Sequence, residues 1–260
     1  MSLKTKGRSE VVILGSGALD FRLGEQARSA PGLALRLGRK TLLFDLGFGA
    51  MGRLLHAGID PSSVCAAFFT HRHPDHVGDI PALLFHLNSL QPPASGILKI
   101  FGPRGFSSFM ARLTRAHHPW LRPRGWRLEI RELEERDHAQ GSGWKVRCRE
   151  VPHSTEALAF RLESSAGSLG YTGDTDLDEG LPGFFAGLDL LVAECTYPSA
   201  EPRRRGHMTV NESVALSRAC AAKKTIFTHL TAGSEKELSR TPLCKGREFI
   251  AYDLMRIPLR

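Results

Sequence analysis

Four potential metal ligands lie within six consecutive positions of the chain. They stand in the run THRHPDH, which begins at residue 70 and contains His71, His73, Asp75 and His76. Side chains two positions apart in extended backbone point to the same side, so His71 and His73 can bind one ion. Pro74 turns the chain and lets Asp75 and His76 face a neighbouring position. Imidazole and carboxylate ligands together suit zinc, and also iron or manganese, which predicts a metal site of the kind that hydrolases use.

One loop cannot complete two metal sites, so further ligands should lie at the ends of other predicted strands. Three candidates occur in order: His153 after Val151-Pro152, Asp174 in the run YTGDT, and His229 at the end of TIFTH. Each is a side chain of ligand type placed where a buried strand is expected to leave the core. Asp174 is suited to bridge two ions, because a carboxylate has two oxygens that can each bind a metal.

The elements that must position these residues are short strands interleaved with helices. Strands are predicted at residues 11–15, 33–37, 41–46, 66–70, 98–101, 157–162, 169–172, 190–194 and 225–228, with a final strand within 249–259. Helices are predicted at 51–57, 79–90, 106–116 and 209–222, the last opened by the capping box of Thr209 and Glu212. Residues 120–150 are expected to form surface strands and loops with a turn at 141–143. Short strands in both halves favour two β-sheets covered by helices in a single α/β domain.

Composition limits the class of protein. The chain has 260 residues, of which 42% are hydrophobic, so it can build a sizeable core. No apolar run approaches the roughly 18–20 residues that span a bilayer, so no membrane contact is predicted. The five cysteines are odd in number and include no CxxC pair, which favours a reducing cytoplasm over a disulfide framework. Residues 1–10 are expected to be a flexible tail ahead of a domain at 11–260, and the net charge of +8 suits an anionic substrate.

The ordered set of motifs resembles the metallo-β-lactamase superfamily over nearly the whole chain. The resemblance rests on LFDLG at residues 43–47, the HxHxDH run, the later single His, the Gly-Asp-Thr turn and the terminal Thr-His-Leu. It implies a four-layer αββα sandwich with two divalent metal ions, zinc first and manganese or iron(II) as alternatives. By the resemblance, His71, His73 and His153 hold one ion, Asp75, His76 and His229 hold the second, and Asp174 bridges them. Relatives of this kind are often homodimers.

Two further residues are similar to elements of ribonuclease Z and its relatives. Glu194 stands in AECTY at a strand end, and His207 stands in GHMT just before the capped helix. In that branch a Glu-His pair serves the leaving group and the scissile phosphate. A phosphodiester has a poor alkoxide leaving group, so a positioned acid helps, and Glu194 would orient His207 and raise its pKa. Asp75 is a candidate to accept the proton of the nucleophile. The resemblance therefore implies a phosphodiesterase or endonuclease that acts on RNA or on a small or cyclic phosphodiester.

The resemblance to ribonuclease Z fails at one place. That family usually carries a long tRNA-gripping arm between the positions matching His153 and Asp174, and here only residues 154–173 lie between them. The arm is therefore expected to be absent, as in relatives that act on small or cyclic phosphodiesters. A lactonase or thioesterase on the same scaffold stays open as an alternative, because it does not need Glu194 and His207. A nucleic-acid-binding module with a relic site is a second alternative, against which the complete ligand set argues.

Basic segments offer a further possible contact with nucleic acid. Three arginines at 203–205 precede His207, and a second group interleaves basic and aromatic residues. The second group consists of Arg115, Arg122, Arg124 and Arg127 with Trp120 and Trp126. Arginine can bind phosphate and tryptophan can stack on bases, but a basic surface with two half-buried tryptophans explains the pattern equally well. His117 and His118 are interpreted as surface or packing residues. His56, His86 and His138 have no ligand partners at useful spacing.

Overall fold

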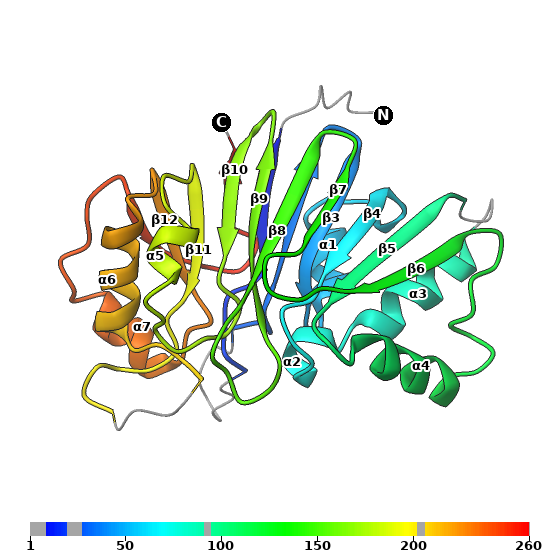
Figure 1. The fold of residues 1–260 in the computed structure, drawn as a ribbon, viewed down its shortest axis with the longest axis horizontal. Helices are drawn as coiled ribbons and strands as arrows, with labels where there is room; N and C mark the ends of the chain where they lie inside the picture. Colours follow the sequence, from blue (N-terminus) through cyan, green and yellow to red (C-terminus); the bar gives the residue numbers. More distant parts are fainter. Residues whose placement is uncertain (1–8, 20–27, 91–94, 202–205, 260) are drawn as a thin grey trace.

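The computed structural model describes residues 9–19, 28–90, 95–201 and 206–259. These residues form two seven-stranded sheets that pack face to face, with helices on both outer faces (Figure 1). The arrangement is the four-layer αββα sandwich predicted from the sequence. Residues 1–8 of the predicted tail and the arginines at 203–205 lie outside the described residues.

In the first sheet, the THRHPDH run lies at the end where the parallel strands have their carboxyl ends. Its strand order is β14 (Arg256–Pro258), β1 (Glu10–Gly15), β2 (Gly32–Leu37), β3 (Lys40–Leu46), β4 (Val64–Phe68), β5 (Ile97–Gly102) and β6 (Arg127–Glu132). Strands β2 and β3 pair antiparallel as a hairpin. Strands β3 to β6 pair in parallel, so their carboxyl ends meet at one edge, and the run THRHPDH follows the end of β4 there.

The second sheet aligns the other candidate residues in the same manner. Its order is β13 (Glu248–Ile250), β12 (Lys224–Thr228), β11 (Leu190–Glu194), β10 (Gly167–Tyr171), β9 (Leu158–Ser164), β8 (Trp144–Glu150) and β7 (His138–Gly141). Strands β10, β11 and β12 are parallel neighbours. The residues at or just beyond their carboxyl ends, Asp174, Glu194 and His229, therefore come to one edge of the sheet.

Helices cover the outer face of each sheet. The first sheet carries α1 (Ala50–His56), the 3₁₀ turn η1 (Pro61–Ser63), α2 (Pro74–Val77), α3 (Ile80–Ser89) and α4 (Phe106–Ala116). The second carries α5 (Leu181–Phe184), α6 (Val210–Cys220) and α7 (Ala232–Leu238). The predicted capping box at the start of α6 is confirmed, with Thr209 and Glu212 bonded reciprocally. No helix in the described part of the chain is both long and apolar enough to cross a bilayer.

Strands β1 to β4 of the first sheet are largely buried on both faces, because alternate residues pack into two different cores. Leu42 and Phe44 of β3 face the core between the sheets, whereas Leu43 packs with the helices. Phe68 stacks between Phe44 and Phe101, with ring centroids 5.2 and 4.7 Å apart. Complete burial of such a side chain contributes about 1.5–3 kcal/mol to folding, so the strand ends that carry the polar candidates stand on a rigid base.

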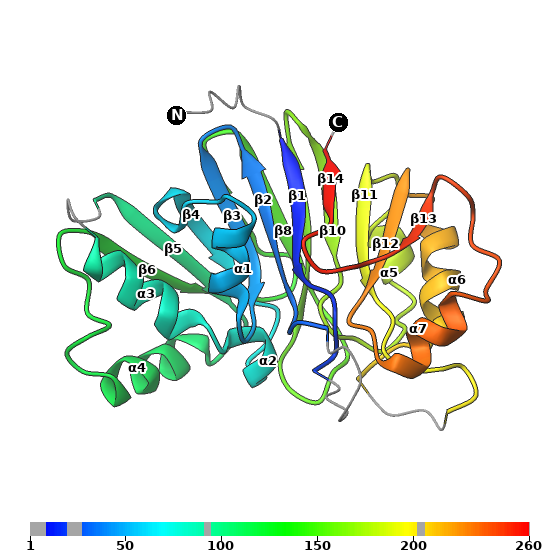
Figure 2. The same ribbon diagram turned by 180° about the vertical axis from the view of Figure 1, so that it is seen from behind.

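The final strand predicted within residues 249–259 is present, but the segment is not one continuous strand. Two short strands form instead: β13 pairs in parallel with β12 in the second sheet, and β14 pairs antiparallel with β1 in the first (Figure 2). The chain crosses between the sheets at Leu254, whose φ is +65°. A continuous extended strand cannot hydrogen-bond to both sheets, so this reversal of the backbone divides the segment.

Candidate metal centre

The seven predicted metal ligands lie together at the edge of the sandwich where strands of both sheets end. They are His71, His73, Asp75 and His76 from the segment after β4, His153 after β8, Asp174 after β10 and His229 after β12. Pro74 begins the one-turn helix α2 rather than a simple turn, and this turn carries Asp75 and His76. The fold thus assembles residues from four separate parts of the sequence at one place.

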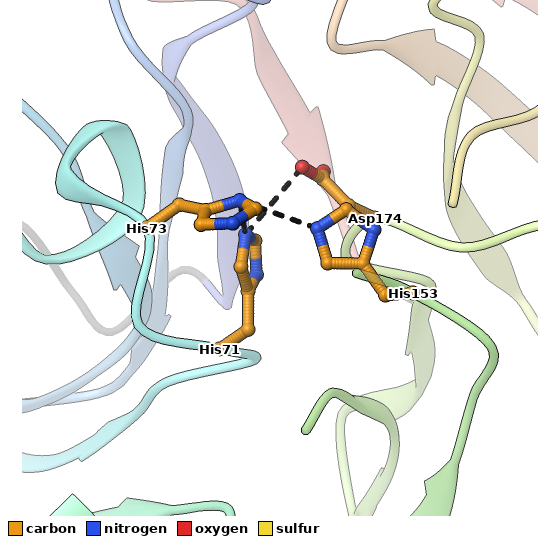
Figure 3. Close-up of side chains that lie close together, drawn as sticks. All are labelled: His71, His73, His153 and Asp174. Carbon is orange, nitrogen blue, oxygen red and sulfur yellow. Dashed lines mark hydrogen bonds and ion pairs between the residues drawn. The ribbon is translucent and has the colours of Figure 1, made fainter. Parts of the chain in front are cut away.

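Three histidines and one aspartate form a first group (Figure 3). Nδ1 of His73 lies 2.9 Å from Nε2 of His71 and 3.2 Å from Nε2 of His153. Oδ2 of Asp174 lies 3.6 Å from Nε2 of His71. Each of these residues offers one donor atom, and the donor atoms all lie within 4.8 Å of one another. The spacing and atom types suit a single divalent cation.

Asp75, His76 and His229 form a second group next to the first. Oδ2 of Asp75 lies 3.7 Å from Nε2 of His76 and 3.8 Å from Nε2 of His229. The same two nitrogen atoms lie 3.2 and 3.3 Å from Oδ2 of Asp174. Oδ2 of Asp174 therefore faces both groups, which is the position that a bridging carboxylate needs.

The unpaired nitrogens of this cluster match a metal ion better than a hydrogen-bond network. Nε2 of His76 and Nε2 of His229 are buried without a hydrogen-bond partner among the described residues. Buried polar atoms are normally satisfied, and a cation between these nitrogens would satisfy both. Burial lowers the pKa of His153 to about 4, so its ring is neutral at pH 7 and able to bind a metal. Burial opposes the charge of Asp174, but His229 and His76 hold the pKa of that carboxyl well below 3.8.

In four of the histidines, Nδ1 is the ring nitrogen that faces away from the cluster, and its hydrogen-bond partner keeps a proton on it. Nδ1 of His153 donates to the carbonyl oxygen of Gly206 at 2.7 Å, and Nδ1 of His76 lies 2.7 Å from Oδ2 of Asp45. A carbonyl and a carboxylate only accept, so each Nδ1 carries the proton. Nε2 is then the ring nitrogen that faces the cluster and can bind a metal. Burial lowers the pKa of His76, but Asp174 and Asp45 outweigh it and raise that pKa well above 6.5, so a cation at its Nε2 would displace a proton. Such outer contacts are the usual support of metal-binding histidines.

Two threonines impose the same state on His71 and His229. The hydroxyl of Thr70 donates its single proton to Asp45 at 2.8 Å, so it accepts from Nδ1 of His71 at 3.0 Å. The hydroxyl of Thr196 donates to Glu194 and accepts from Nδ1 of His229 at 2.8 Å. Both rings therefore present Nε2, rather than Nδ1, to the other ligands.

Asp45 supports the site, although in the sequence it stands out only as part of the LFDLG motif. Its carboxylate is fully buried and accepts from the backbone N–H of Thr70 at 2.8 Å and from the hydroxyl of Tyr171 at 2.9 Å. It also holds His76, as described above. Its φ of +55° is strained for a residue other than glycine, and such strain is common at functional sites. An acidic residue within an otherwise apolar strand is the signal that could have found it.

Gly173 allows Asp174 to approach the first sheet. Its φ is +57°, and a Cβ atom there would lie only 2.6 Å from Cγ2 of Thr70. Glycine is therefore required where the end of β10 passes the start of the THRHPDH segment.

Glu194 and His207 lie together beside the second group. Nδ1 of His207 is 3.3 Å from Oε1 of Glu194 and 3.9 Å from Oδ2 of Asp174. Glu194 is buried and also accepts from the backbone N–H groups of Thr175 and Met208, at 2.6 and 3.2 Å. Burial lowers the pKa of His207, but the hydrogen bond and charge of Glu194 outweigh it and raise that pKa to about 9. The fold thus places a histidine that favours its protonated form beside the cluster.

A pocket of about 470 Å³ opens over these residues. Five predicted site residues line it: His73, Asp75, Asp174, His207 and His229. Its remaining wall includes Leu19, Tyr197 and Thr231. The volume falls in the range of small-molecule sites, so a substrate of that size can reach the cluster.

None of the other described histidines and none of the cysteines joins a group of metal-ligand type. His56, His117, His118 and His138 are exposed, as expected for surface residues, and within the described residues none joins a group of ligand type. All five cysteines are free. The two tryptophans differ from the expectation that both are half-buried, because Trp126 is buried and Trp120 is exposed.

The αββα sandwich and the His/Asp cluster at its edge define a hydrolase of the metallo-β-lactamase fold. Residues 40–230 match the model of the beta-lactamase superfamily domain, and the chain belongs to this family. A ribonuclease Z of Exiguobacterium sp. is 28% identical over 279 residues, which cover 86% of this chain and 90% of that protein. The aligned span exceeds the 260 residues of this chain, so that relative has segments without a counterpart here.

Two solved structures show the same fold. The metallo-beta-lactamase fold protein YhfI from Bacillus subtilis superposes with a TM-score of 0.81 at 19% identity, covering 96% of this chain and 99% of that one. A diphosphatase of the PhnP family gives a TM-score of 0.77 at 20% identity, covering 97% and 98%. Both structures show the fold of this chain, and its sequence relatives include ribonuclease Z.

Proposed function

We propose that this protein is a two-metal phosphodiesterase that acts on RNA or on a small or cyclic phosphodiester. The observation that carries the proposal is the pair of Glu194 and His207 beside the pocket, because hydrolysis of a lactone or thioester does not need such an acid. The relationship to ribonuclease Z supports the same class of reaction.

Two groups of residues would hold the metals. His71, His73 and His153 would bind the first ion, Asp75, His76 and His229 the second, and Asp174 would bridge them. Zinc suits this set of nitrogen and oxygen donors best, and manganese or iron would also fit. When bound, two such ions neutralise charge on the phosphate oxygens and lower the pKa of water.

The side chains of the site would move the protons of the reaction. Asp75 would accept a proton from the attacking water as the new P–O bond forms. The protonated ring of His207 would donate its proton to the leaving oxygen as the old P–O bond breaks. Glu194 would hold the ring in place and keep it protonated, because its carboxylate faces Nδ1 of His207. Proton transfer of this kind contributes about 10²–10⁴-fold to rates.

The segment between His153 and Asp174 bears on the size of the substrate. Residues 158–171 of this interval form the hairpin of β9 and β10, which pairs with the rest of the second sheet. No inserted arm is present among residues 154–173, all of which the structure describes. Recognition of a substrate must therefore come from the pocket and from the surfaces around it.

A substrate panel tests the proposed reaction. Metal-loaded protein is expected to hydrolyse an aryl phosphodiester much faster than a lactone or a thioester of similar size. Release of the phenolate can be followed by absorbance, and the other two reactions by proton or thiol release. Turnover of the lactone alone would contradict the proposal and favour a lactonase.

Asp45→Asn is expected to weaken metal binding by about 10- to 100-fold, the usual cost of losing an outer contact to a ligand. The amide keeps the shape of the carboxyl but has a single oxygen. It therefore cannot accept both from the backbone N–H of Thr70 at Oδ1 and from Nδ1 of His76 at Oδ2, and it lacks the charge that holds the proton on Nδ1 of His76. Zinc affinity can be measured by competition with a coloured chelator. Tyr171→Phe is the matched control, because it removes only one hydrogen bond from Asp45 and should have a smaller effect. Equal affinities of Asp45→Asn and the unchanged protein would exclude this supporting role.

A further inference from the structure

A strongly basic surface extends along α4 and the segment that follows it. Residues 80–128 contain no aspartate or glutamate, and they contain seven basic residues. These are Lys99, Arg104, Arg112, Arg115, Arg122, Arg124 and Arg127. The five arginines from 112 onward are exposed. We call α4 together with residues 117–127 the α4 surface.

Trp120 is the most exposed of the tryptophans. Its side chain is 56% accessible, and the guanidinium of Arg124 lies 5.9 Å from the centre of its ring. Phe85 on the neighbouring helix α3 is also half exposed. A large aromatic ring left in solvent beside an arginine is the combination that stacks on bases and binds phosphate.

The loop that carries Trp120 is held by one side chain. Nδ2 of Asn88 donates to the carbonyl oxygens of Trp120 and Arg122 at 2.8 and 2.9 Å. Oδ1 of Asn88 accepts from the backbone N–H of Arg124 at 3.1 Å and from Nε1 of Trp126 at 2.9 Å. These bonds fix the backbone of residues 120–126, so Trp120 is presented in a set position at little entropic cost on binding.

The α4 surface starts beside the candidate metal centre. A Cβ atom at Gly105, just before α4, would lie 2.4 Å from the guanidinium of Arg72, which stands between His71 and His73. Arg112 and Arg115 stand three positions apart on α4, which places them on one side of the helix. Figure 1 shows α4 leading away from α2 along the lower edge of the molecule. The helix has 11 residues and therefore covers about 16 Å.

We propose that the α4 surface binds a single-stranded segment of an RNA substrate and so extends recognition beyond the pocket. The inference rests on the proposed phosphodiesterase function. A single strand is favoured because its unpaired bases can stack on Trp120, whereas the bases of a duplex are already stacked on each other. The arginines would neutralise phosphates along the same strand. The ion pairs of the described residues use other arginines, such as Arg131 and Arg149, so those of the α4 surface are available for phosphates.

Binding of a fluorescently labelled oligouridylate of about 15 nucleotides, followed by anisotropy, tests this proposal on the full chain. Trp120→Ala is expected to weaken binding by about tenfold, within the range measured for loss of one stacked base. Replacing both Arg122 and Arg124 with alanine should reduce the slope of log affinity against log salt by about 1.4, or roughly 0.7 for each phosphate contact. A double variant with Arg240→Ala and Lys245→Ala is the matched control. It removes the same charge from exposed positions next to α7.

Three results would overturn the proposal. They are unchanged affinity of Trp120→Ala for the oligouridylate, an equal loss of affinity in the control double variant, and binding of anionic phospholipid vesicles that is equally strong and depends on the same residues.

Hydrolysis of a small aryl phosphodiester separates this inference from the proposed function. Trp120→Ala should leave that hydrolysis at the wild-type rate while raising KM for the RNA about tenfold. Absence of phosphodiester hydrolysis in the unchanged protein would reject the proposed function, whatever the binding assay shows.

Discussion

Asp174→Ala is expected to remove most of the bound metal and to lower phosphodiester turnover by more than about a hundredfold. Loss of a residue that only orients a ligand already costs about 10- to 100-fold in metal affinity, and Asp174 is proposed to be a ligand itself. Its Oδ2 lies 3.2, 3.3 and 3.6 Å from Nε2 of His76, His229 and His71. Without it, the buried histidines of both groups lose the negative charge that they share.

Elemental analysis of purified protein measures this effect directly, with turnover of an aryl phosphodiester as the second readout. Asp174→Asn should give an intermediate loss, because the amide keeps one oxygen but not the charge. Asp189→Ala is the control, since Asp189 is a carboxylate before β11 that pairs with Lys223 away from the cluster. Metal content equal to that of the unchanged protein in Asp174→Ala would remove Asp174 from the ligand set.

The parts of this site that the sequence predicted share one property. Each predicted ligand stands within or just after the end of a predicted strand, as His229 follows TIFT and Asp174 follows an apolar segment and a glycine. Parallel strands bring such positions to one edge, so local pattern and general topology were enough to group them. The grouping is confirmed as geometry, whereas metal binding by these residues stays a prediction.

The supporting residues could not be predicted in the same way. The role of Asp45 depends on Thr70, His76 and Tyr171, which lie in other strands and loops. No pattern within a short window of sequence shows these contacts. Trp120 and Trp126 illustrate the same limit, because both depend on Asn88 of α3. That residue bonds the ring nitrogen of Trp126 inside the structure and only the backbone of Trp120, whose ring is left in solvent.

His207→Ala is expected to lower turnover of a phosphodiester with an alkoxide leaving group by about a hundredfold or more and to leave the metal content unchanged. The ring stands at the pocket with Nδ1 facing Glu194, so its Nε2 is the atom available to a leaving oxygen. An alkoxide needs a proton as the bond breaks, whereas a nitrophenolate does not. The loss should therefore be much smaller with a nitrophenyl ester, a dependence that a merely structural role would not produce.

The position of His207 allows one competing role, because its Nδ1 also lies 3.9 Å from Oδ2 of Asp174 and the ring could act as a ligand with His229. Metal analysis separates the two roles, since loss of metal from His207→Ala would make His207 a ligand rather than an acid.

Glu194→Gln provides a second test of whether His207 acts as the acid. An acid works only while protonated, so activity falls as pH rises through the pKa of His207. Burial alone lowers that pKa and Glu194 raises it to about 9, so Glu194→Gln should move the alkaline limb of the pH profile of kcat to lower pH. A limb that stays in place would show that His207 does not supply the proton.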